Sequence, residues 1–175
     1  TLPSDKTNVA AHVAQLMLDE FKPPFGISLS LEKNMPLGSG LGSSGASSAA
    51  AAFAVNRLLP NPISKMALIR FAVEGERLAS GSPHADNVAP SLLGGICLIR
   101  SYHPLEVIQL PYHNTLYWIV ASPDLTILTK QARELLPKSV SLANAIEQSG
   151  NLGALITGFS LGDHALITSS LHDNF

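Results

Sequence analysis

The sequence predicts a mixed α+β fold, and three observations support this class. Residues with the apolar spacing of helices occupy both ends of the chain. Short apolar segments with the spacing of strands form two separate groups along it. The chain of 175 residues is 46% hydrophobic, which is sufficient for a packed core.

Helices are predicted where apolar residues recur at helical spacing next to start and stop signals. Ser4 is the expected cap of a first helix that begins near Asp5, and the prolines at 23–24 end it. Ser64 is expected to start a later helix in the same way, after the prolines of 60–62. The predicted helices cover 5–21, 49–59, 64–79, part of 82–93, 139–159 and 162–171.

Strands are predicted from alternation and from short apolar runs. Residues 25–33 alternate apolar and polar side chains, the pattern of a half-buried strand. Three further strands are expected at 95–101, 105–110 and 115–121, and 125–136 is expected to be a loop entering a helix. The single cysteine, Cys97, is expected to be a buried strand thiol, and one cysteine allows no internal disulfide.

The strongest chemical signal is the glycine- and serine-rich segment 36–48, which joins a predicted strand to a predicted helix. Glycines let the backbone approach a phosphate closely, and the first N–H groups of a helix have no intrahelical partner. The hydroxyls of Ser43 and Ser44 are expected to cap this helix, and one could also reach a metal ion held by the phosphates. The segment therefore predicts a nucleotide-phosphate site.

Other interpretations of this loop compete with a phosphate site. It could be a turn of small residues with a serine cap. The glycines also match G-x-G-x-x-G, but a dinucleotide site needs a second strand, and 64–79 has helical spacing instead. A Walker-type loop needs Gly-Lys-Ser/Thr, and no lysine lies between Lys33 and Lys65. Backbone amides, a metal and groups from elsewhere must then neutralise the phosphate charge.

Three ordered blocks resemble the GHMP kinases, which phosphorylate small molecules such as galactose, homoserine, mevalonate and phosphomevalonate. Residues 36–44 match the signature P-x-x-x-G-L-G-S-S at every invariant position. Residues 74–77 followed by Pro-His-Ala-Asp-Asn at 83–87 resemble the second, acidic block in the form found in homoserine kinases. Residues 129–137 resemble the T-x-x-A-R-x-x-L-P block of bacterial homoserine kinases.

The resemblance implies a GHMP-kinase-like fold of two layers, a mixed sheet and helices. It implies that residues 1–122 form the N-terminal, ATP-binding domain without its first strands. Residues 123–175 would form the start of the C-terminal domain, so the chain is expected to be incomplete at both ends.

The same resemblance implies roles for individual residues. Ser44 and Glu76 would hold Mg²⁺, while Glu76, Asp86 and Asn87 would be catalytic. Substrate would be bound by His84, Asp86, Asn87 and Arg133, the last through the bidentate pairing of a guanidinium with a carboxylate. The residues implied to bind ATP are Pro36, Leu37, Gly38, Ser39, Gly40, Leu41, Gly42, Ser43, Ser44, Gly45 and Ala46.

Four of the five side chains with an implied role outside the loop have a structural alternative. Glu76 could be a solvated helix charge paired with Arg77 or Arg70, and Asp86 could cap a short helix. Arg133 could be a surface arginine, and His84 could bond substrate or only shape its turn. Whether Asp86 acts as a general base or only orients substrate also stays open.

The implied reaction is transfer of the ATP γ-phosphate to the hydroxyl of L-homoserine, which gives O-phospho-L-homoserine for threonine biosynthesis. Two alternatives remain, another GHMP kinase of the mevalonate type and a catalytically inactive nucleotide-binding paralogue. The net charge of −2 gives no reason to expect nucleic acid or an anionic membrane as partner. The expected location is the cytoplasm, and a homodimer is left open.

Overall fold

The structure is a computed structural model that describes residues 5, 7–35, 40–114, 116–121 and 136–173. The chain divides into two compact units, Thr1–Ile108 and Gln109–Phe175, and each is described by itself. The predicted domain boundary at residue 122 stays a prediction. Within the described ranges, no helix is both long enough and apolar enough to span a bilayer.

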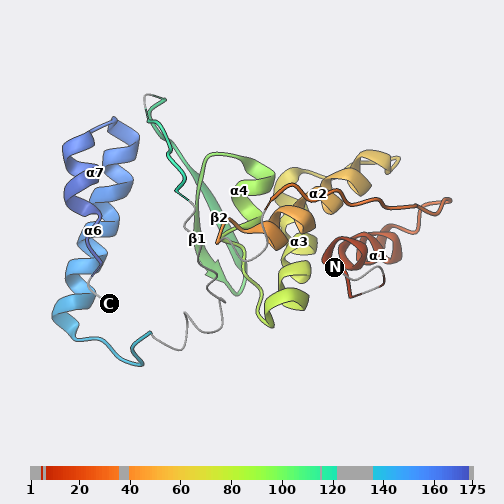
Figure 1. The fold of residues 1–175 in the computed structure, drawn as a ribbon, viewed down its shortest axis with the longest axis horizontal. Helices are drawn as coiled ribbons and strands as arrows, with labels where there is room; N and C mark the ends of the chain where they lie inside the picture. The colour runs from red at the N-terminus through yellow and green to blue at the C-terminus, as the bar shows by residue number, and fades with distance from the viewer. Residues whose placement is uncertain (1–4, 6, 36–39, 115, 122–135, 174–175) are drawn as a thin grey trace. The chain divides into compact units, whose positions relative to one another are not determined.

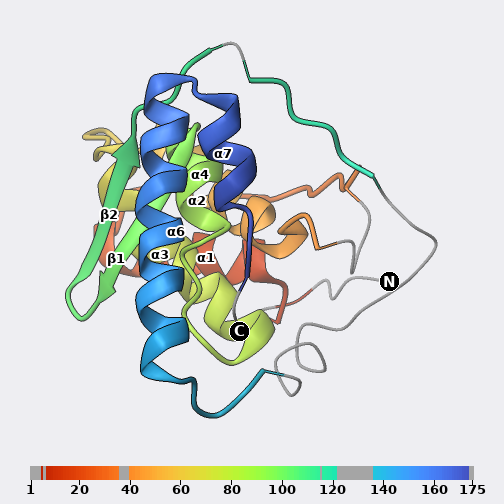
Figure 2. The same ribbon diagram turned by 90° about the vertical axis from the view of Figure 1, so that its left-hand side faces the viewer.

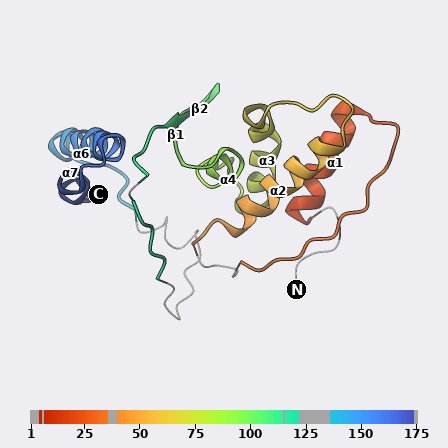
Figure 3. The same cartoon turned by 90° about the horizontal axis from the view of Figure 1, so that it is seen from above.

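Four helices form most of the first unit. Helices α1 (Val9–Phe21), α2 (Ser43–Leu58) and α3 (Lys65–Ser80) pack against one another, as Figures 1 and 3 show. The short helix α4 (Val88–Leu93) contacts both α2 and α3. The core is built from the apolar faces of all four helices, and its fully buried side chains include Val13, Met17, Ala52, Val55, Leu68, Ile69 and Val88.

The helix starts follow local hydrogen bonding. Helix α3 is capped as predicted, because the Ser64 side chain accepts a hydrogen bond from the N–H of Ala67 at 3.2 Å. The prediction for α1 is wrong by a turn, since its cap is Asn8, which accepts from the N–H of Ala10 at 2.9 Å. Just before it, Asp5 accepts from the N–H of Thr7 at 2.9 Å, and this local turn replaces the first predicted helical residues.

The sheet of the described residues is a hairpin of two strands. Strands β1 (Ile96–Tyr102) and β2 (Leu105–Leu110) pair with each other, and α4 contacts β1. They confirm two of the predicted strands and, with the helices, the mixed α+β class. The predicted strands at 25–33 and 115–121 are wrong for this structure, because neither 25–33 nor the described part of the second segment, 116–121, has a hydrogen-bonded strand neighbour among the described residues.

The second unit contains the predicted helical pair. Helices α6 (Leu142–Leu161) and α7 (His164–Ser170) lie side by side, as Figure 2 shows. Gly162 ends α6 in the left-handed conformation with a φ of 69°, and the Asp163 side chain caps α7 by accepting from the N–H of Leu166 at 3.0 Å. The two predicted helices are therefore confirmed, each within a few residues.

Candidate functional site

The N-terminus of α2 leaves its first amides free of intrahelical and side-chain acceptors. Gly42 is the N-cap residue, in the left-handed conformation with a φ of 72°, and no side chain caps the helix. The first intrahelical bond runs from the N–H of Ala46 to the carbonyl of Gly42, at 2.9 Å. The N–H groups of 43–45 therefore have no acceptor within the helix, which makes this end of α2 suitable for an anion.

The expectation that Ser43 and Ser44 cap α2 is wrong. Both residues lie inside the first turn rather than before it, so neither hydroxyl can take the capping position. The Ser43 hydroxyl instead donates to the carbonyl of Met35 at 3.4 Å, and Ser44 is partly buried. Of the other predicted loop residues, Gly40, Leu41 and Gly42 are described, whereas Pro36, Leu37, Gly38 and Ser39 lie outside the described residues.

Asn87 lies directly against this glycine turn, although it is far away in sequence. A Cβ added to Gly42 would come within 2.4 Å of Asn87 Oδ1, and one added to Gly45 within 2.9 Å of Asn87 Cβ. Glycine is therefore required at both positions for the α4 segment to approach α2 this closely. The structure brings two separate blocks of the predicted site together at this contact.

A second close contact joins α2 to α3. A Cβ added to Gly75 would come within 2.2 Å of Ser48 Oγ and 2.9 Å of Val13 Cγ2. Gly75 thus lets α1 and α2 approach α3 at the position that precedes Glu76. This packing holds Glu76 within the helical core rather than on its surface.

Glu76 is buried, and one oxygen of its carboxylate has no hydrogen-bond partner among the described residues. The residue is 5% exposed, and its Oε1 atom has no hydrogen-bond partner among the described residues. Both candidate arginines pair elsewhere: Arg77 with Glu74 at 3.0 Å, and Arg70 with Glu20. The surface-charge alternative is therefore wrong for Glu76 and describes Glu74 instead.

Lys33 is a further candidate site residue, which the sequence analysis did not identify. Burial lowers the pKa of its ammonium below the ordinary value, and the nearby carboxylate of Glu76 opposes this shift. The side chain thus lies within electrostatic reach of Glu76, just before the glycine-rich loop. Its position in the sequence, just before the glycine-rich loop, is the one feature that could have indicated a role for Lys33. A single lysine at such a position does not by itself predict a binding site.

The turn between α3 and α4 carries the remaining described site residues. Asp86 is exposed and does not cap α4, because Asn87 occupies the N-cap position. His84 is partly buried, and its Nε2 atom has no hydrogen-bond partner in the part of the chain that the structure describes. The buried Ala85 between them donates its N–H to the Tyr102 hydroxyl at 3.3 Å, which attaches this turn to β1. Arg133 lies outside the described residues.

A magnesium ion fits this set of residues by its chemistry. Magnesium prefers oxygen ligands and is commonly held by one or two carboxylates together with substrate phosphates. Glu76 supplies a buried carboxylate oxygen without a hydrogen-bond partner among the described residues, and Ser44 a hydroxyl in the first turn of α2, which no side chain caps. The described residues contain no group of three or more His, Cys, Asp or Glu side chains that could hold a metal alone.

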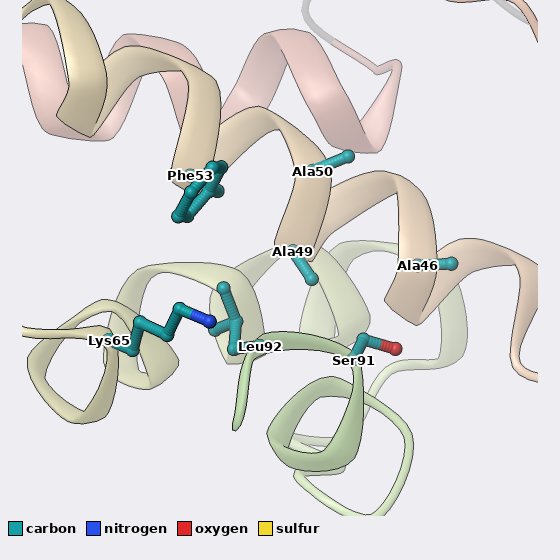
Figure 4. Close-up of a pocket in the computed structure, with 7 residues that line it drawn as sticks. All are labelled: Ala46, Ala49, Ala50, Phe53, Lys65, Ser91 and Leu92. Atoms are coloured by element: carbon teal, nitrogen blue, oxygen red, sulfur yellow. The ribbon is translucent and has the colours of Figure 1, made fainter. Parts of the chain in front are cut away.

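A shallow groove of about 400 Å³ runs along a different face of α2 (Figure 4). The groove begins at Ala46 in the first turn of α2. It includes neither Ser48, which lies on the face of α2 that packs against α3, nor Glu76, which belongs to α3. The Lys65 ammonium lies 5.8 Å from the centre of the Phe53 ring on this groove. The lining residues are Ala46, Ala49, Ala50, Phe53, Lys65, Ser91 and Leu92.

Sequence comparisons agree with these features. The family described as "GHMP kinases N terminal domain" matches residues 8–95. A homoserine kinase of Chlorobium phaeobacteroides (strain BS1) is 46% identical over 174 residues, which are 96% of this chain and 54% of that protein. A homoserine kinase of Methanococcus vannielii is 43% identical over 149 residues, covering 85% of this chain and 49% of that protein.

A solved structure gives the same result. The crystal structure of a homoserine kinase from Cytophaga hutchinsonii has a TM-score of 0.88 and 43% sequence identity, covering 98% of this chain and 55% of that one. The chain therefore spans about half the length of the relatives that it matches. The family match extends from α1 to the start of β1 and includes the α2 turn, Glu76 and the 83–87 turn. This chain belongs to the GHMP kinase family.

Proposed function

We propose that the protein containing this chain is a homoserine kinase, which transfers the γ-phosphate of ATP to the hydroxyl of L-homoserine. The observation that supports it most is the buried carboxylate of Glu76, whose Oε1 has no hydrogen-bond partner among the described residues, in a chain whose α2 N-terminus has no side-chain cap. The names of the three relatives reported above, which are homoserine kinases at 46% or 43% identity, support the choice of acceptor.

ATP would bind with its phosphates at the amides of 43–45, where the positive end of the α2 dipole favours negative charge. The Lys33 ammonium, close enough to Glu76 for their charges to interact, would add positive charge at the same place. Glu76 and Ser44 would hold Mg²⁺, which neutralises phosphate charge when bound. These residues thus supply positioning and electrostatic stabilisation, the main requirements of phosphoryl transfer.

The acceptor would bind next to this turn through the 83–87 segment. Asn87, packed on Gly42 and Gly45, would donate or accept a hydrogen bond at the substrate. Asp86 would orient the acceptor hydroxyl or take its proton as the hydroxyl oxygen bonds to the transferred phosphorus. The buried Nε2 of His84 would find a partner on the acceptor, and Arg133 would pair with its carboxylate.

The family also admits two other functions, a mevalonate-type kinase and an inactive nucleotide-binding paralogue. Mevalonate also carries a carboxylate but lacks an amino group, so the turn that carries Asp86 and Asn87 has less to bind. We further propose a cytoplasmic enzyme that acts on a small molecule and not on nucleic acid. A homodimer remains a prediction that light scattering can measure.

The test is coupled ADP release by the full-length protein with Mg-ATP and homoserine, mevalonate, galactose or no acceptor. The proposal expects turnover with homoserine alone. Turnover with mevalonate and not with homoserine would show that the proposed acceptor is wrong and that the enzyme is a mevalonate-type kinase. ATP binding without ADP release from any acceptor would favour the inactive paralogue.

A further inference from the structure

Buried polar atoms without partners are few, and they gather around the candidate site. Buried polar side-chain atoms in folded proteins nearly always have a hydrogen-bond partner. In the described part of this chain the exceptions are Ser48 Oγ, Glu76 Oε1 and His84 Nε2. Two of these belong to the predicted site, whereas Ser48 has no role assigned so far.

Ser48 lies between the two parts of the site that would hold the metal. It follows Ser44 by four residues on α2, so the two hydroxyls share one face of the helix. It is 0% exposed and lies against Gly75, the residue that precedes Glu76 on α3. The hydroxyl therefore lies where α2 meets the turn of α3 that carries the Glu76 carboxylate.

The hydroxyl at this position makes no hydrogen bond that would stabilise the fold of the described residues. Burying a hydroxyl without a hydrogen bond costs free energy, and serine is a weaker helix former than alanine. The neighbouring positions of α2 are largely alanines, at 46 and 49–52. An alanine at 48 would remove only the oxygen atom and so fit the same space.

We propose that Ser48 is a positioning residue for the metal-binding carboxylate. When the site is occupied, the Ser48 hydroxyl donates a hydrogen bond to one oxygen of Glu76, which directs the other oxygen to Mg²⁺. Carboxylates that bind metals are commonly oriented by such outer hydrogen bonds, and losing one typically costs about 10–100-fold in metal affinity or activity. The inference rests on the metal and nucleotide part of the proposed function and extends it by one residue.

The test compares Ser48→Ala with Ser47→Ala in the full-length protein. Ser47 is a matched control because it is also buried on α2, yet its hydroxyl already donates to the carbonyl of Ser43 at 3.0 Å. The melting temperature is measured without metal or nucleotide, and Mn²⁺ affinity is measured by paramagnetic resonance with ADP present. For Ser48→Ala we expect a melting temperature that is unchanged or higher, and Mn²⁺ affinity reduced about 10–100-fold.

Weaker Mn²⁺ binding without any loss of melting temperature identifies a positioning role for Ser48. A purely structural serine would lower the melting temperature on removal and leave Mn²⁺ affinity as in Ser47→Ala, and this result would overturn the inference. If homoserine is turned over while Ser48→Ala leaves Mn²⁺ affinity unchanged, the inference fails and the proposed function stands. If no acceptor is turned over but Ser48→Ala still weakens Mn²⁺ binding, the inference stands and the proposed acceptor is wrong.

Discussion

Asn56 is buried at the end of α2 that is joined to α3, and both its side-chain nitrogen and its side-chain oxygen are hydrogen-bonded. Its amide donates to the carbonyl of Ile63 at 2.9 Å, and its Oδ1 accepts from the N–H of Ile63 at 2.8 Å. Nearer the other end of the same pair, Ser48 and Glu76 are equally buried, but each has a polar atom without a partner among the described residues. The two ends therefore differ in hydrogen bonding and not in burial.

This difference separates residues that hold the fold from residues that act on a ligand. A buried polar group with both bonds made stabilises the native structure, as Asn56 does for the connection between the helices. A buried polar group with no partner costs free energy in the isolated protein. Such a group is consistent with a site whose partners arrive with the ligand, and the following changes test that distinction.

The largest effect is expected at Glu76. Glu76→Gln keeps the shape of the side chain and removes the charge that would hold Mg²⁺, so kcat should fall by about 10²–10³-fold. Steady-state ADP release with homoserine measures this loss. The matched control is Glu74→Gln on the same helix, where an exposed ion pair with Arg77 is lost at a cost of about 0–1 kcal/mol. An equal loss of kcat in both variants would contradict the assignment of Glu76 to the ligand site.

The next largest effect is expected for a substitution of Asn56, which should change the stability of the protein and not its activity. Asn56→Ala leaves the N–H and carbonyl of Ile63 without their partner, so the free energy of unfolding should fall by about 2–3 kcal/mol. Chemical denaturation measures this change, and kcat should stay near wild type wherever the protein is folded. Asn61→Ala, an exposed asparagine in the same connection, should change stability by about 0.5 kcal/mol or less. A reduced kcat in folded Asn56→Ala would contradict the separation of roles.

A smaller effect is expected where the glycine turn meets Asn87. In Gly45→Ala the new Cβ would lie 2.9 Å from Asn87 Cβ, so α4 or the turn must shift. Displacements of about 1 Å in an active site can cost about 100-fold, and we expect kcat/KM for ATP to fall at least about tenfold. The control is Gly153→Ala in α6, which has open space around it and should only gain about 1 kcal/mol of helix stability. Unchanged kinetics in Gly45→Ala would show that the close contact is not needed.

The smallest effect concerns Lys33 and pH. Because burial lowers its pKa, Lys33 should react with an amine-acylating reagent at lower pH in the folded protein than in the denatured protein. Between the lowered pKa and the ordinary value of 10.5 the unfolded state binds more protons, so the stability contribution of Lys33 rises with pH in that window. Mass spectrometry of folded and denatured protein labelled over a pH series gives the midpoint of Lys33 labelling in each state. Identical midpoints in the two states, or labelling of folded Lys33 that Mg-ATP does not reduce, would remove Lys33 from the site.

The sequence predicts the helices of this chain well because their signals are local. The Ser64 cap and the apolar spacing of α3 lie within a few residues of the structure that they specify. The start of α1 is less certain, since Asp5 and Asn8 both offer side-chain oxygens to nearby N–H groups. The alternation at 25–33 is also local, but a strand needs a neighbour that alternation cannot supply.

The site is predicted in part, for the same physical reason. The residues of the loop, Glu76 and the 83–87 turn are found through motifs, yet their packing against one another is not. Asn87 contacts Gly42, and Lys33 lies near Glu76, but the two residues of each pair are far apart in sequence. The missing partners of Ser48 and Glu76 are a property of the folded core, and no local pattern encodes them.

The most direct test of the central claim is the melting temperature of Glu76→Gln with and without Mg-nucleotide. If the buried carboxylate is held for the metal, the variant without ligand melts at or above the wild-type temperature, because a buried charge with an oxygen that lacks a hydrogen bond has been removed. Its stabilisation by Mg-nucleotide is then much smaller than in wild type. A variant that melts well below wild type without ligand, and still gains the full shift with Mg-nucleotide, would contradict the account and make Glu76 a structural residue.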